Sequence, residues 1–163
     1  MTDCPALHAV LARSGRAMFV FALALLLAGC GPLEVRSAPP GSDLDGLRVD
    51  GDVLVLRMLV INRNDVPLAL SGARLEVTLG GETLEARDWP LSLDLGPRNR
   101  EAVELRMPAT DAVLRALERL ERGDRAPLPY ELTGRWTLAQ GGDERIRRTG
   151  FLHPVPGRPG RFR

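Results

Sequence analysis

The hydrophobic and polar positions of the chain fall into three successive patterns. An unbroken apolar run over residues 17–27 is followed by a stretch rich in Pro, Gly and Ser, which ends near residue 43. Beyond it, apolar residues alternate with polar residues at a period of two. This alternation is typical of strands with one buried and one solvated face. The sequence therefore predicts one β-rich domain over residues 44–153.

Seven segments are predicted to be strands. Val53–Ile61 is a nearly continuous apolar run interrupted by Arg57, which fits a central strand covered on most of both faces. The other six alternate between apolar and polar residues or follow a Gly-Gly pair that can form a turn. These six are residues 74–79, 84–89, 91–95, 103–107, 130–138 and 146–152.

The segment over residues 111–123 has a helical pattern instead. Its apolar side chains fall on one helical face, which is made of Val113, Leu114, Leu117 and Leu120. Thr110 or Asp111 can cap the start of this helix, and Gly123 can end it. The chain is thus predicted to be all-β, with one helix of about three turns between its fifth and sixth strands.

The first thirty residues have the layout of a secretory signal. Arg13 and Arg16 precede the apolar run, and small residues follow it. Leu27, Ala28, Gly29 and Cys30 form a lipobox, in which signal peptidase cuts before a cysteine that carries lipid. Met18 is an alternative start, but it would remove both arginines.

A retained transmembrane helix is the alternative interpretation of this segment. Roughly thirteen residues reach only about 20 Å at 1.5 Å per residue, which is shorter than a hydrocarbon core of about 30 Å. We therefore expect residues 1–29 to be a signal peptide and residues 30–43 to be a lipidated cysteine and flexible tether. Diacylglycerol and an N-acyl chain on Cys30 would anchor the protein, with no other cofactor. In a Gram-negative host, an Asp directly after the lipidated cysteine favours retention in the inner membrane. The residue here is Gly31, which favours the outer membrane if the host is Gram-negative.

The predicted mature chain is electrically balanced and has no disulfide. Arg13, Arg16 and Asp3 precede the cut, which leaves 20 of the 22 basic and 20 of the 21 acidic residues. A balanced, exported chain argues against a nucleic-acid partner. Cys4 leaves with the signal and Cys30 carries lipid, so the domain depends on apolar burial alone.

Catalytic and metal-binding residues are few. A Ser-His-acid arrangement would need His153 with Ser71 or Ser92, and neither serine lies in a nucleophile-elbow sequence. One histidine without a free thiol predicts no metal site. An acidic cluster suggests calcium, but its spacing fails the EF-hand pattern twice, and we interpret its Asp-Gly pairs as turns. The cluster consists of Asp43, Asp45, Asp50 and Asp52.

Arginines gather near the end of the sequence. They are Arg145, Arg147 and Arg148 on the last predicted strand, and Arg158, Arg161 and Arg163 in a Pro/Gly-rich tail over residues 154–163. They could contact lipid headgroups or anionic polysaccharide. Protection of a sheet edge is the favoured interpretation of the strand arginines. Prolines interrupt the donor row of the tail, so we expect a loose basic segment.

The segment Leu59–Leu70 resembles the signature of the LEA type 2 family, also called the water-stress and hypersensitive-response (WHy) domain. In that family a strand ends in Asn-Pro-Asn and a Pro-Leu pair follows; the matching residues here are Asn62, Asn64 and Pro67. Arg63 departs from the pattern, which puts the rigidity of the turn in doubt. Later elements agree in order and spacing. They are the Tyr-x-Leu-x-Gly element at residues 130–134 and Thr149, Gly150 and Phe151 in the closing strand.

The resemblance implies a fibronectin III-like or immunoglobulin-like β-sandwich of about seven strands, with one helix before the last hairpin. It implies a structural role for Asn62, Asn64 and Pro67, and no enzymatic activity. We expect a protective (desiccation) or interaction domain in the cell envelope, whose partners would be client proteins, lipids or envelope components. The alternatives are a lipid or apolar-ligand adaptor at the outer membrane and a structural role in an envelope complex. An adaptor would need a cavity between its sheets, which a core with few large aromatics could leave.

Overall fold

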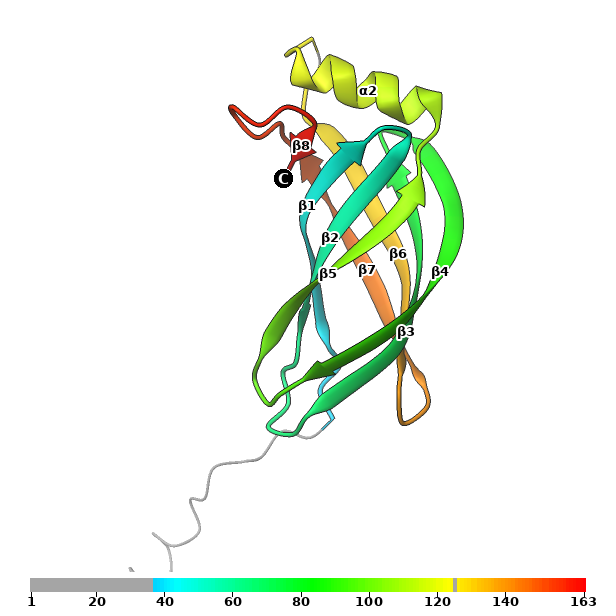
Figure 1. The fold of residues 1–163 in the computed structure, drawn as a ribbon, viewed down its shortest axis with the longest axis vertical. Coiled ribbons are helices and arrows are strands. Elements are labelled where there is room, and N and C mark those ends of the chain that lie inside the picture. Colours follow the sequence, from blue (N-terminus) through cyan, green and yellow to red (C-terminus); the bar gives the residue numbers. More distant parts are fainter. Residues whose placement is uncertain (1–36, 125) are drawn as a thin grey trace, which may run out of the picture. The chain divides into compact units, whose positions relative to one another are not determined.

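Two antiparallel four-stranded sheets form a sandwich in the computed structural model of the protein, which describes residues 37–124 and 126–163 (Figure 1). Sheet A has the order β5-β2-β1-β8, and sheet B has the order β4-β3-β6-β7. The strands are β1 (Gly41–Asp50), β2 (Val53–Ile61), β3 (Leu68–Leu79), β4 (Glu82–Leu95), β5 (Arg100–Pro108), β6 (Leu128–Leu138), β7 (Asp143–Leu152) and β8 (Arg161–Phe162). The helix α2 (Asp111–Glu121) connects β5 to β6. The predicted all-β sandwich with one helix before the β6–β7 hairpin is confirmed.

Alternating side chains from both sheets meet in the core. On β2 the inward positions Leu54, Leu56 and Met58 are buried, while Arg57 between them is exposed. Trp136 of β6 is fully buried between the sheets, and its indole Nε1 donates a 2.7 Å hydrogen bond to Ser42 Oγ of β1. Because a buried indole N–H without a partner would be costly, this bond lets the largest core side chain lie between the sheets.

The helix has the predicted caps. The Thr110 hydroxyl accepts a 3.3 Å bond from Val113 N, and Gly123 leaves the helix with a φ of 79°. The buried face consists of Val113, Ala116, Leu117 and Leu120, so Ala116 takes the place that we predicted for Leu114. With this face turned inward, α2 covers one end of the sandwich (Figure 1).

The strand predictions were wrong for β4 and for β1. Residues 84–89 and 91–95 are not two strands but one, β4, which continues through Pro90 beside a register shift in its partner β3. Strand β1 was missed because its acidic residues suggested turns. Asp50-Gly51 does form the β1–β2 turn, but Asp45-Gly46 lies inside β1, at a β-bulge between Leu44 and Gly46. The fold therefore begins before residue 44.

The expectation of a loose tail was also wrong. Residues 154–163 fold back, and β8 pairs with the middle of β1, where Phe162 faces Leu47. The pairing avoids the prolines, which precede β8. Phe162 is only 2% exposed and belongs to the hydrophobic core, and the Gly160 amide donates a 2.8 Å bond to Glu121 Oε1 on α2. One buried aromatic side chain thus fixes the end of the chain.

No helix within residues 37–124 and 126–163 combines the length and apolarity needed to cross a membrane.

Replacing Phe162 with alanine is expected to lower the free energy of unfolding by about 3–5 kcal/mol, because it leaves a cavity where the tail enters the core. Chemical denaturation measures this change. Phe151→Ala is the matched control, since Phe151 is 61% exposed, and it should change stability by no more than about 0.5 kcal/mol. Equal effects of the two substitutions would contradict the role assigned to the tail.

Candidate functional site

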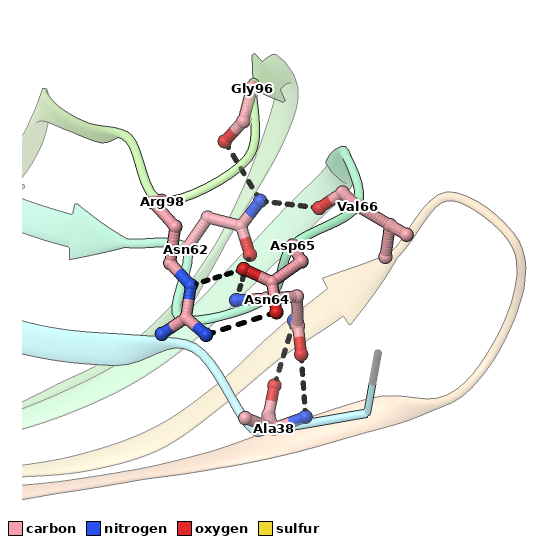
Figure 2. Close-up of polar contacts among 7 residues, drawn as sticks. All are labelled: Ala38, Asn62, Asn64, Asp65, Val66, Gly96 and Arg98. Carbon is pink, nitrogen blue, oxygen red and sulfur yellow. Dashed lines mark hydrogen bonds and ion pairs between the residues drawn. The ribbon is translucent and has the colours of Figure 1, made fainter. Parts of the chain in front are cut away.

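The family-motif residue Asn62 lies at the end of β2 and is 1% exposed. Its Nδ2 donates to the carbonyl oxygens of Val66 (2.8 Å) and Gly96 (2.9 Å) (Figure 2). It also donates to a third carbonyl oxygen, that of Leu95, at 3.3 Å. Its Oδ1 accepts the Asn64 amide at 2.9 Å, which closes a turn of the Asx type. One carboxamide therefore joins the β2–β3 connection to the β4–β5 connection.

Asn64 uses its side chain to hold a segment that precedes β1. Its Nδ2 donates to the Ala38 carbonyl at 3.0 Å, and its Oδ1 accepts the Ala38 amide at 2.6 Å. Figure 2 shows the two bonds side by side, so the carboxamide pairs with Ala38 as a neighbouring strand would. The polar groups of Asn64, which is 4% exposed, are thereby satisfied.

An ion pair closes the same junction on its outer side. Arg98 holds both carboxylate oxygens of Asp65, with Nε–Oδ1 at 2.7 Å and Nη2–Oδ2 at 3.1 Å. The Asp65 carboxylate raises the pKa of Arg98, mainly through this hydrogen bonding. The Arg98 backbone amide also donates to the Asn64 carbonyl at 2.9 Å, and its φ is 53°. Arg98 is thus held by its side chain and its backbone, in a conformation that non-glycine residues seldom adopt.

We call these contacts among Ala38, Asn62, Asn64, Asp65 and Arg98 the asparagine junction. Its carboxamide groups bond to backbone of the same chain, so the arrangement fixes loops and holds the segment that leads into β1. It supplies no reactive group. Pro67 is exposed and so is Arg63, at the position where the family usually has proline. The bonds of the two asparagines hold the turn although that proline is missing.

Close packing between strands accounts for the other glycines of the motif. Tyr130 of β6 faces Gly150 of β7, and a Cβ on Gly150 would come within 2.8 Å of the phenol ring. Gly134 faces Leu75 of β3, and a Cβ there would overlap the carbonyl oxygen of Arg74. Burial, and to a lesser extent the charge of nearby Asp43, raises the pKa of Tyr130. These glycines are therefore steric requirements of sheet B.

The acidic cluster is engaged in ion pairs and a turn. The pairs are Asp43 with Arg148 (3.1 Å), Asp45 with Arg57 (2.8 Å), and Asp50 with Arg106 (2.7 Å) and Arg48 (3.3 Å). Hydrogen bonding and charge from Arg106 hold the pKa of Asp50 below its ordinary value. Asp52 lies in the β1–β2 turn. Within the described ranges, no group of three or more potential ligands gathers at one point as a metal ion would require.

The candidate triad is not assembled. Ser71 and Ser92 lie at the end of sheet B where Leu70 pairs with Leu138, whereas His153 follows the end of β7 that pairs with the start of β6. The eleven residues of β6 separate these ends by about 30 Å. His153 is exposed, and its backbone exchanges two bonds with Arg163, at 2.9 and 3.0 Å.

The strand arginines lie on β7, which is an edge strand of sheet B, as predicted. Arg147 pairs with Glu131 at 3.3 Å, and Arg148 binds Asp43 and the carbonyl of Ser42 on β1. Leu27, Ala28, Gly29 and Cys30, the lipobox residues, lie outside the described residues.

The sequence pattern found two of the five residues of the asparagine junction. It missed Ala38, Asp65 and Arg98, whose partners lie between 26 and 34 positions away in the sequence. The Pro-Arg-Asn sequence at residues 97–99 marks a turn, but nothing in it indicates which loop the arginine contacts.

Comparisons with known proteins give one family match and several similar solved structures. A family model described as "Late embryogenesis abundant protein" (LEA_2) matches residues 57–148, more than half of the chain. The solution structure of the Arabidopsis thaliana protein AT1g01470 is similar, with a TM-score of 0.55 and 15% identity over 82% of this chain and 94% of that one. A crystal structure of an Archaeoglobus fulgidus protein gives a TM-score of 0.44 and 10% identity over 72% of this chain and 98% of that one. No curated protein sequence matches the chain.

Asn62→Asp is expected to lower the free energy of unfolding by at least about 3 kcal/mol at neutral pH. The substitution keeps the shape but removes three donated bonds and puts a carboxylate against three carbonyl oxygens. Denaturant titration measures the loss. The control is Asn99→Asp, the same chemical change at an exposed residue, with an expected effect within about 0.5 kcal/mol.

Arg63→Pro is expected to raise stability by about 0.4–1 kcal/mol by restricting the unfolded chain. The Arg63 amide takes part in no described hydrogen bond, so proline would remove none. Asn62, the residue before it, directly follows the extended strand β2, and a residue that precedes proline favours an extended backbone. Thermal unfolding would show this as a higher midpoint. A lower midpoint would mean that the backbone at residue 63 cannot accept proline.

Proposed function

The chain belongs to the late embryogenesis abundant LEA_2 family, and from this premise we propose that it is a membrane-anchored, non-enzymatic protein that protects components of the cell envelope during drying. The family match over residues 57–148 carries the proposal. The geometry supports it, because the motif asparagines hold backbone, and the histidine and serines that could form a triad lie at opposite ends of sheet B.

The proposed anchor is lipid on Cys30 in the outer membrane, and the asparagine junction sets how far the domain can lie from it. Ala38, the residue held by Asn64, comes eight positions after Cys30. A fully extended chain of that length spans at most about 28 Å. The junction end of the sandwich would therefore stay within that distance of the lipid. We infer that the protein works at the membrane surface.

The competing proposal, an adaptor for lipid or another apolar ligand, receives less support from the core. It rested on a cavity between the sheets of a domain with few large aromatics. Trp136 is fully buried there, and Phe162 fills the end below α2. Native mass spectrometry of the purified protein distinguishes the two: a retained noncovalent lipid would favour the adaptor.

The purified full-length protein in detergent is expected to preserve the activity of a dehydration-sensitive enzyme, such as lactate dehydrogenase, better than an equal mass of albumin in the same detergent. The surface of the sandwich is polar and its core is closed, so the protein itself should survive drying and rehydration. Recovered enzyme activity after drying is the measurement. Recovery no better than with albumin would remove the protective proposal.

The anchor has its own control in cells. Radiolabelled palmitate should be incorporated into the wild-type chain but not into Cys30→Ser, and only the wild type should fractionate with outer membranes. Labelling of both proteins would contradict lipidation at Cys30. Protection by both would show that anchoring is separate from the protective activity.

A further inference from the structure

A basic groove lies on the outer face of sheet A, where the folded tail meets β1 and β2. It has a volume of about 410 Å³ and is lined by five arginines, Arg48, Arg57, Arg158, Arg161 and Arg163. Two carboxylate side chains, those of Asp45 and Glu104, also line it, which leaves an excess of three positive charges among the lining side chains. The chain is close to neutral as a whole, so this excess is local.

The three tail arginines supply this excess. Arg57 is paired with Asp45, and Arg48 with Asp50, whereas Arg158, Arg161 and Arg163 form no ion pair within the part of the chain that the structure describes. Two of them flank Phe162, whose burial fixes the backbone from which they project. Side chains alternate across a strand, so Arg161 and Arg163 lie on the face opposite the inserted ring. These charges are thus held in place before any partner arrives.

Strand register places two like charges against each other in the groove. Arg161 of β8 is directly opposite Arg48 of β1. Opposed like charges destabilise a strand pair unless a counter-charge lies near them. Asp50 approaches Arg48 at 3.3 Å, but no carboxylate pairs with Arg161 among the described residues. An anion in the groove would contact both guanidinium groups.

A larger hollow on the outer face of sheet B has equal numbers of basic and acidic side chains in its lining. It measures about 710 Å³ and also contains opposed arginines, Arg135 facing Arg74 on one side and Arg145 on the other. There, three arginines are matched by three acidic side chains in the lining. Arg135 is paired with Asp143 at 3.1 Å, and Arg74 with Asp88. The two hollows therefore differ in side-chain charge although arginine lines both.

We propose that the basic groove docks the outer face of sheet A onto anionic phospholipid headgroups of the membrane. The geometry allows this contact, because β1 runs from the segment held at Ala38 along the groove, and eight residues from Cys30 provide up to about 28 Å of reach. The inference rests on the proposed anchor, since an anchored domain meets the headgroups at high effective concentration. Arginine suits phosphate, which it binds through two parallel hydrogen bonds.

The test uses the full chain, purified from bacterial membranes and reconstituted into phosphatidylcholine vesicles with or without phosphatidylglycerol. Energy transfer from tryptophan to a dansyl-labelled headgroup reports how close the sandwich lies to the bilayer, because both tryptophans, Trp89 and Trp136, belong to the sandwich. We expect stronger transfer with phosphatidylglycerol, and a return to the phosphatidylcholine value at high salt.

The decisive variant is the triple substitution Arg158→Gln, Arg161→Gln and Arg163→Gln. Each arginine near an anionic membrane raises the partition constant about fivefold, so the loss of three should weaken docking about a hundredfold. The matched control, Arg74→Gln, Arg135→Gln and Arg145→Gln, removes the same charge from the opposite face and should dock like the wild type. Arg48→Gln, a single change on β1, should weaken docking about fivefold without altering the tail.

Several results would overturn the proposal. The first is energy transfer that does not depend on phosphatidylglycerol. The second is an equal loss of docking in the two triple variants, which would indicate nonspecific electrostatic attraction. The third is that glycerol phosphate raises the melting temperature of the wild type but not of the Arg158, Arg161 and Arg163 triple variant, while neither protein docks to vesicles. The groove would then bind a free phosphate compound. Flotation with pure phosphatidylcholine vesicles tests the anchor separately. A chain that fails to float there but still binds phosphatidylglycerol vesicles from solution would contradict the anchor and keep the groove.

Discussion

The hydrogen bonds of one buried carboxamide organise the end of the sandwich where the chain enters. Asn62 is at the end of a central strand, where a backbone that changes sheets would leave carbonyl groups buried without donors. Its side chain satisfies three of them at once and orients Asn64 to hold the segment before β1. Two residues thereby fix two crossings between the sheets and the approach of the chain from its proposed anchor. The role of the motif is therefore structural, since it carries no reactive group.

The opposite end depends on apolar burial. The described domain contains no cysteine, so the closed end is held by the covering helix and by Phe162. Trp136 also lies between the sheets, with its one polar side-chain atom bonded to Ser42. The polar side-chain atoms inside this core are satisfied: no side-chain nitrogen or oxygen in the described part of the chain is buried without a hydrogen-bond partner. A domain built this way needs no oxidation step to become stable.

How much of this could be predicted from sequence depends on the range of each interaction. Period-two alternation and Gly-Gly turns located the strands of sheet B and β5 of sheet A, and an apolar run located β2. Thr110 and Gly123 located the helix. These signals could be used because they are local. Strand β1 escaped because its outward carboxylates, which pair with arginines on other strands, resemble turn residues when taken alone. The tail escaped because prolines argue against a strand, while Phe162 uses only a two-residue pairing after them. The asparagines of the junction were found from the family motif, but their partner Arg98 was not, because only the folded chain brings it to Asp65.

The pairing of β8 with β1 has a consequence for how the protein is made. The first strand of the sandwich hydrogen-bonds to the last, across more than a hundred intervening positions. Sheet A therefore cannot be completed until β8 has been synthesised and, if the protein is exported as we propose, has passed through the translocation channel. Until then Leu47 lacks the ring that covers it. A nascent chain would thus remain incompletely folded, and so competent for the proposed export, until Phe162 emerges.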